Sequence, residues 1–270
     1  MTNPEQFNEL LNNLKEKNAQ RTVNIWIPSL ARGVEFRHLN LNQQKSLINS
    51  SIRENLLKLD FSRNIYDIIV TNIVDKEVDV GKLNIVDMIS IGISYRAVDI
   101  SDEYGFFLAE QFYPVDLNKL CETIRTTDYG DVFKTDTIVS DSYHVTVQVP
   151  YIHTDKLLND HLFEKYAEIP DEAEELKEIL ADVYIHEACK YITNIDIVTE
   201  GDNPGTPPVE IDFTKLTAEQ RLDVIEQIPL TVLNRLVSVS DKVQSIESKL
   251  LDVDLDGETA TIMLNSAFFT

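Results

Sequence analysis

The chain has 270 residues, 43% of them hydrophobic, and a formal net charge of −22. This length and hydrophobic content suffice to bury a core, whereas the charge opposes close approach to phosphate backbones and anionic lipid, so nucleic acid and membrane surfaces are excluded as expected partners. The two cysteines, Cys121 and Cys189, can form neither a disulfide framework nor a four-thiolate metal site, which indicates a reducing compartment.

The N-terminal residues predict an amphipathic helix. Asn3 can cap this helix, and Pro4 occupies a position where a missing N–H costs nothing. Its apolar residues share one face: Phe7, Leu10, Leu11 and Leu14. Residues 1–18 lack the apolar core of a signal peptide, and no later stretch is long enough to span a bilayer. We therefore expect the protein to stay in the cytoplasm in which it is made.

A β-hairpin is expected after this helix. Apolar and polar residues alternate over 23–27, up to Pro28, and a second short strand over 34–37 follows a turn at Arg32 and Gly33.

Two helices and an ambiguous segment come next. Asn40 and Gln43 have capping-box spacing, and Asp60 begins a further helix whose apolar side chains share a face. Residues 83–97 alternate like a strand but also show helical spacing, so their periodicity leaves both assignments open.

The middle of the chain has the composition of strands and helices in alternation. Aromatic residues at 104–112 and strict alternation at 143–149 predict strands. Between these strands, residues 115–125 form a predicted helix capped by Asp116. Helices over 154–167 and 171–191 follow, and the acidic first turn of the second suits the helix dipole.

The last third begins with a loop over 200–208, rich in glycine and proline, that is expected to join strands at 195–198 and 209–213. Thr217 and Gln220 form a second capping box, Pro229 ends that helix, and an apolar seam marks the next one. A final strand is predicted over 259–264.

These elements predict an α+β fold, mostly helical, with an N-terminal β-hairpin and a small antiparallel sheet. We divide it into an N-terminal arm, hairpin and helical region (residues 1–100) and a mixed sheet and helical region (residues 101–270). The two regions could equally form one continuous domain.

Two sequence patterns resemble metal sites but are incomplete. His186 and Glu187 begin an H-E-x-x pattern, but Lys190 stands where a zinc protease requires its second histidine. A run at the carboxyl end copies the first half of a calcium loop: Asp252, Asp254, Asp256 and Gly257. Its twelfth position is Met263 instead of a bidentate glutamate, so the pattern favours an Asp-Gly hairpin turn, with a weak surface cation site as the alternative.

The remaining reactive residues do not form a recognisable catalytic set. The spacing of His144, His153 and His161 fits neither one helix face nor one turn. There is no G-x-S-x-G elbow and no phosphate-binding glycine loop. We therefore predict that the protein is not an enzyme, binds no cofactor or metal, and has no small-molecule substrate.

Three features of the sequence are candidates for partner binding. The acidic stretch 168–187 could face a basic protein or could be a solvated helix face. Trp26 could anchor an interface or pack half-buried in its strand. Phe268 and Phe269 cannot remain in water without exposing two large rings, so they either close the core of the protein, which we favour, or enter a neighbouring protein.

Three blocks of residues resemble the baseplate hub and hub assembly proteins of T-even-like contractile-tailed phages, of the gene twenty-six type. The first runs from Asn24 to Leu30 through an Ile-Pro-Ser turn, then through Val34 to Arg37 and a Gln43-Gln44-Lys45 helix. The second runs from Leu83 to Ala97, which the resemblance assigns to a helix. The third is the carboxyl-terminal part, ending in paired phenylalanines. Many relatives carry a cysteine cluster after the second block, but residues 101–120 contain none, so a zinc ribbon is not implied here.

The resemblance implies a late phage protein that helps assemble the baseplate hub, either as a virion component or as an assembly chaperone. Its implied partners are other hub and tail proteins, met in the host cytoplasm during assembly and in the tail baseplate. The acidic composition leaves an alternative, a DNA mimic or other inhibitor that binds a host nucleic-acid enzyme. A hydrolase with a cryptic metal site is a third hypothesis, which the missing ligand pattern disfavours.

Overall fold

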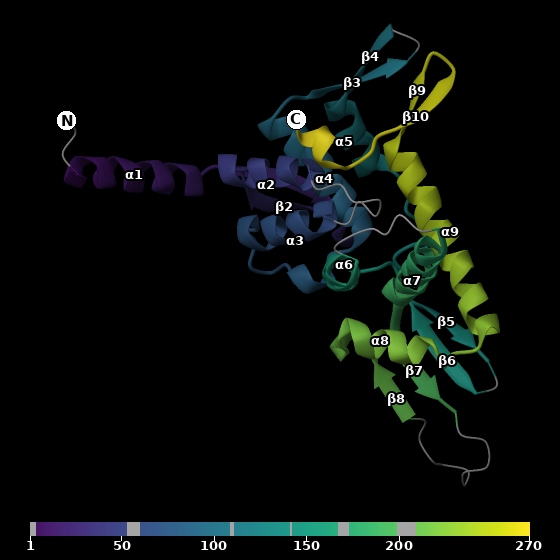
Figure 1. The fold of residues 1–270 in the computed structure, drawn as a ribbon. Coiled ribbons are helices and arrows are strands. Elements are labelled where there is room, and N and C mark those ends of the chain that lie inside the picture. Colours follow the sequence, from purple (N-terminus) through teal and green to yellow (C-terminus); the bar gives the residue numbers. More distant parts are fainter. Residues whose placement is uncertain (1–3, 53–59, 109–110, 141, 167–172, 199–208) are drawn as a thin grey trace.

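The computed structural model describes residues 4–52, 60–108, 111–140, 142–166, 173–198 and 209–270. It is a mixed α+β fold, in which helices alternate with several small antiparallel sheets (Figure 1). Helix α1 (Pro4–Ala19) extends away from the body of the molecule at the N-terminal end. Among the helices of the described residues, none is both long and apolar enough to cross a membrane.

The predicted N-terminal hairpin is confirmed. Strands β1 (Thr22–Ile27) and β2 (Arg32–Arg37) pair antiparallel around a short 3-10 turn over Pro28–Leu30. Gly33 lies opposite Trp26, and a Cβ at this position would come within 2.0 Å of the Asn24 side chain. The glycine therefore allows the Asn24 amide to lie across the neighbouring strand.

Three helices follow the hairpin: α2 (Leu41–Ile52), α3 (Asp60–Asn72) and α4 (Ile85–Asp99). The capping box predicted for the first is present, because the Asn40 side chain accepts from the backbone of Gln43 while the Gln43 side chain accepts from the backbone of Asn40. The ambiguous segment is helical, as the resemblance implied. Its side chains are buried on almost every side of α4, which removes the one-sided pattern that would have marked a helix in the sequence.

A two-stranded hairpin and a four-stranded sheet make up most of the β structure. The hairpin consists of β3 (Glu103–Leu108) and β4 (Gln111–Asp116), and it leads into α5 (Leu117–Thr126), capped by Asp116 as predicted. The sheet has the order β5-β6-β7-β8 and is antiparallel throughout. Its strands have these bounds: β5 (Asp136–Val139), β6 (Tyr143–Val147), β7 (Ile192–Ile197) and β8 (Val209–Asp212). The predicted loop 200–208 lies outside the described residues.

The other helices pack around α4 and the four-stranded sheet: α6 (Ile152–Lys165), α7 (Ala173–Tyr191), α8 (Ala218–Ile225) and α9 (Leu230–Leu251). The capping box of Thr217 and Gln220 is confirmed at the start of α8. The final strand is shorter than predicted, since β10 (Glu258–Thr261) ends before Ile262, and its partner β9 (Asp252–Leu255) was not predicted. A 3-10 turn over Ser266–Phe269 follows.

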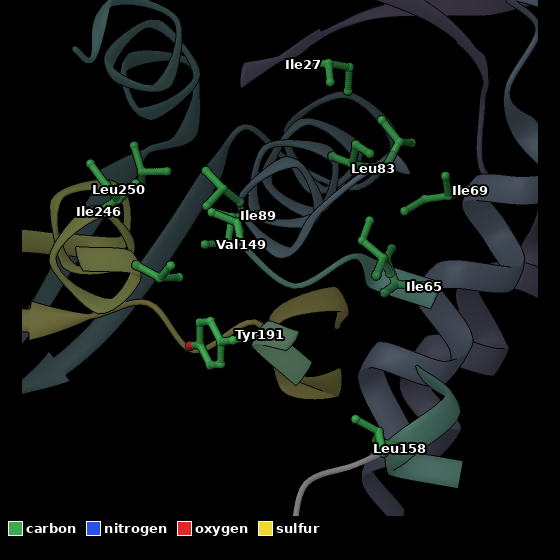
Figure 2. Close-up of a cluster of buried hydrophobic side chains, with 14 of the residues drawn as sticks. Ile27, Ile65, Ile69, Leu83, Ile89, Val149, Leu158, Tyr191, Ile246 and Leu250 are labelled. Carbon is green, nitrogen blue, oxygen red and sulfur yellow. The ribbon is translucent and has the colours of Figure 1, made fainter. Parts of the chain in front are cut away.

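One hydrophobic cluster forms the core, and it includes residues from both of the predicted regions, 1–100 and 101–270. Figure 2 shows part of this cluster. Ile27 of β1 and Ile69 of α3 lie on one side of it, and Ile246 and Leu250 of α9 lie on the opposite side. Helix α4 contributes Ile89 between them. The core is thus continuous across residue 100.

Candidate functional site

The residues that carry the family resemblance meet one another at α4. The Asp87 carboxylate is fully buried and accepts hydrogen bonds from the Ser29 backbone N–H (2.9 Å), the Ser29 hydroxyl (2.6 Å) and the Asn84 backbone N–H (2.9 Å). Burial raises the pKa of this carboxyl, while its hydrogen bonds act in the opposite direction. Asp87 therefore joins the Ile-Pro-Ser turn of the first block to the start of the helix in the second.

The paired phenylalanines of the third block lie in the core of the same protein. Phe268 and Phe269 are both fully buried, with ring centroids 5.3 Å apart. The Arg96 side chain donates from Nε to the Phe268 carbonyl oxygen at 2.7 Å, and the Phe268 ring packs against Tyr104. The favoured expectation, that these rings close the core of the protein, is confirmed. In this conformation neither ring is available to a partner.

Trp26 is half-buried on β1 and lines a surface cavity of about 530 Å³ between the hairpin, α4 and α5. The Arg125 guanidinium lies 5.9 Å from the centroid of its ring, at the limit of a cation–π contact. Ser94 and Cys121 face the same cavity, and burial raises the pKa of the Cys121 thiol. The partner-binding role of Trp26 stays a prediction.

The residue that interrupts the H-E-x-x pattern is part of an ionic cluster. Lys190 Nζ lies 2.6 Å from Asp155 Oδ1 and 2.7 Å from Glu187 Oε1, and its side chain is only 11% exposed. Burial lowers the pKa of this ammonium, but the two carboxylates raise it by more than burial lowers it. The net effect is a raised pKa. Lys190 therefore stays charged and holds α7 to α6 through Asp155.

A fourth charged group, Glu247 of α9, faces this cluster. Burial, together with the Glu187 and Asp155 carboxylates, raises the pKa of Glu247 to about 7, against the attraction of Lys190. These groups line a groove of about 560 Å³ between α4, α7 and α9, with Tyr184 and Leu233 among its apolar walls. The sequence analysis did not single out Asp155 or Glu247. A signal for Glu247 was present, because it lies between Ile246 and Leu250, two apolar residues of the helix predicted after Pro229.

The histidines do not assemble into a metal site in the part of the chain that the structure describes, where no group of three or more metal-binding side chains occurs. The rings of His161 and His186 stack with centroids 5.5 Å apart. His186 Nδ1 lies 2.6 Å from the Asp182 carbonyl oxygen, and burial lowers the pKa of His186 to about 4. The neutral His186 imidazole therefore has a structural role, in which it donates a hydrogen bond to a backbone carbonyl and stacks on His161.

The acidic run at the carboxyl end forms the hairpin turn that the sequence favoured. Asp256 and Gly257 have φ angles of 57° and 95°, the left-handed values of a tight hairpin turn between β9 and β10. The Asp254 carboxylate accepts from the Gly257 backbone N–H at 2.7 Å. The turn is thus stabilised by the side chain that a calcium loop would use as a ligand.

The acidic segment 168–187 is described only from residue 173 onward. In that part, Asp182 pairs with Lys165 (2.5 Å) and accepts from the Tyr166 hydroxyl, while Glu187 pairs with Lys190. Its carboxylates are therefore partly engaged by cations of the same chain. Whether this face binds a basic protein stays a prediction.

Large apolar side chains are exposed on several elements, and they cluster on α1 and on the β3–β4 hairpin. On α1, Phe7, Leu10 and Leu14 are 54%, 59% and 51% exposed. On the β3–β4 hairpin, Phe107 and Phe112 are 79% and 49% exposed, and both the hairpin and the helix project from the body (Figure 1). Apolar side chains gathered in this way on projecting elements are typical of interaction surfaces.

Comparison of the chain with protein-family models, with curated proteins and with solved structures gave no match.

Proposed function

We propose that this chain is a non-enzymatic protein that helps to assemble the baseplate hub of a contractile phage tail by binding other hub and tail proteins. The observation that carries the binding role is the apolar face of α1. The resemblance of the three sequence blocks supplies the phage context. The proposal places the protein in the host cytoplasm during assembly and, as a component or a departed chaperone, at the tail baseplate.

The apolar face of α1 has the spacing of a helix that binds in a groove. Phe7, Leu10 and Leu14 are three and four residues apart, so they form one stripe along the helix. A 16-residue helix is marginally stable without tertiary packing. Binding of the stripe in an apolar groove on another protein would bury these side chains and would at the same time stabilise the helix.

The charges on α1 favour a protein as its partner. Helices that lie on membranes carry lysine and arginine along their polar face, whereas this helix has Glu5, Glu9 and Glu16 against Lys15 and Lys17. A net charge of −22 on the whole chain also opposes self-association through α1. These charges disfavour a membrane and a second copy of the chain. Another protein with an apolar groove, which we take to be a hub protein, is therefore the favoured partner.

The proposal is tested by co-purification with the individual hub proteins of the virus that encodes this chain. Leu10→Ser should weaken binding to the partner at least tenfold, since one central side chain often dominates such an interface. Leu41→Ser is the matched control, because Leu41 is 64% exposed at the start of α2 and outside the stripe. Equal losses for both variants, or no hub protein bound by the unmodified chain, would contradict the proposal. Competition with duplex DNA for a host nuclease would instead favour the acidic inhibitor.

A further inference from the structure

The β3–β4 hairpin has two different faces. Register pairs Tyr104 with Val115 and Phe106 with Tyr113 on one face, and Tyr104 packs against the buried Phe268 with ring centroids 5.1 Å apart. This face attaches the hairpin to the core. The other face carries three cross-strand pairs from tip to base: Phe107 with Phe112, Gly105 with Pro114, and Glu103 with Asp116.

The outer face is built around an aromatic pair. The Phe107 and Phe112 rings have centroids 5.2 Å apart, and the side chains are 79% and 49% exposed. A Cβ on Gly105 would come within 2.0 Å of the Phe112 ring, so the glycine lets this ring lie flat over the opposite strand. The ring lies beside Phe107, and the pair forms an apolar surface near the end of the hairpin. The hairpin itself projects from the body (Figure 1).

The base of the same face is acidic. Glu103 and Asp116 are exposed and paired across the strands, and Asp102 is the next residue along the chain. In the described residues, the Glu103 carboxylate forms no ion pair with a cation of this chain. Glu103 and Phe107 are four positions apart along an extended strand, a separation of about 13 Å.

We infer that the outer face of the β3–β4 hairpin is a second docking surface, for a protein that has an apolar pocket with lysine or arginine about 13 Å from it. The aromatic pair fills the pocket and Glu103 pairs with the cation. A second copy of this chain is a poor occupant because it carries the same net charge of −22. An anionic membrane is disfavoured by the acidic base. This surface is separate from α1, and only the phage context of its test rests on the proposed function.

The test is site-specific photo-crosslinking of the full-length chain in cells that produce the virus. A benzophenone amino acid is placed at Phe107, at Leu10 on α1, and at Val139, a 54% exposed position on the edge strand β5 that serves as the control. The Phe107 probe should crosslink to one protein, at a peptide with apolar residues and a nearby lysine or arginine. Val139 should give no such product.

Charge reversal then tests the acidic base. In the chain with the Phe107 probe, Glu103→Lys should reduce the crosslink at least tenfold. Glu258→Lys, which makes the same charge change at the first residue of the exposed strand β10, should leave it within twofold. Both positions are exposed, so the melting temperature serves to verify that each variant is folded.

Several results would overturn the inference. One is the absence of a Phe107 crosslink, or a crosslink only to another copy of the chain. A second is an equal loss of the Phe107 crosslink with Glu103→Lys and Glu258→Lys. A third is sedimentation of the chain with phosphatidylcholine vesicles that Phe107→Ser abolishes. A Leu10 crosslink to a tail protein without a Phe107 crosslink would overturn this inference and leave the proposed function standing. A Phe107 crosslink without a Leu10 crosslink to a tail protein would contradict the proposed function of α1 and leave this inference standing.

Discussion

Helices α1 and α4 have nearly the same length, 16 and 15 residues, but opposite surroundings. Helix α4 is buried on almost all sides and contacts the N-terminal hairpin, α5 and α9. Helix α1 projects from the body with its apolar stripe exposed (Figure 1). The same kind of apolar side chain is therefore buried in the core in one helix and exposed in the other. The comparison predicts that stability and binding will respond to different substitutions.

The largest loss of stability is expected in the layer around α4. Phe268→Ala should lower the free energy of unfolding by about 3–5 kcal/mol, because it removes a fully buried ring from contact with Tyr104 and Phe269. Chemical denaturation measures this change. Phe107→Ala, at a 79% exposed position, is the control and should change stability by less than about 0.5 kcal/mol. A loss below about 1 kcal/mol for Phe268→Ala would mean that the C-terminal turn is not part of the core.

The junction at Asp87 should give the next largest effect. Asp87→Ala leaves the Ser29 N–H and hydroxyl and the Asn84 N–H without their acceptor, which should cost about 1–3 kcal/mol in unfolding free energy. Asp87→Asn keeps one carboxamide oxygen as an acceptor, so its loss should be smaller. Equal effects of the two variants would show that packing, and not hydrogen bonding, determines the contribution of this side chain.

The ionised Glu247 carboxylate is expected to lower the free energy of unfolding, and this effect should depend on pH. Its pKa of about 7 in the folded state exceeds its ordinary value of 4.5, so the folded state binds more protons between these values and the contribution of Glu247 to stability falls as pH rises through this window. Glu247→Gln should therefore raise the unfolding free energy at pH 8 by about 1–3 kcal/mol. The gain should vanish near pH 4, where the carboxyl is protonated in both states. A gain that is independent of pH would refute the charge explanation.

The smallest effect on stability is expected for the exposed stripe of α1. Leu10→Ala should change the free energy of unfolding of the whole chain by less than about 0.5 kcal/mol, because the side chain is 59% exposed. Denaturation under the same conditions as for Phe268→Ala makes the comparison direct. A loss above about 1 kcal/mol would show that α1 packs on its own chain in solution, and would remove the contrast between the two helices.

The sequence predicted most elements where a local signal specifies them. The capping residues at Asn40, Asp116 and Thr217 and the alternation in β1 and β6 all correspond to observed helix starts and strands. The period of α4 could not be assigned from its residues alone, because burial on all sides leaves no polar face. Strand β9 was missed because its acidic residues have the composition of a turn.

The candidate site was less predictable than the fold. The amphipathic pattern of α1 indicates that a face will be covered, but it does not indicate whether the same chain or another provides the cover. The aromatic residues at 104–112 predicted a strand, and only the register separates Tyr104, which packs on Phe268, from Phe107, which faces outward. The ion pair between Lys190 and Asp155 depends on two helices meeting, so the broken H-E-x-x pattern gave no indication of it.

The hydrogen bond from Arg96 to the carbonyl of Phe268 joins residues that are 172 positions apart. At translation rates of about 5–20 residues per second, the ribosome adds Phe268 about 10–30 s after Arg96. During that interval α4 is complete but lacks the aromatic layer of Phe268 and Phe269, so part of its apolar surface is not yet covered. The contact that completes the core around α4 can therefore form only after nearly the whole chain has been synthesised.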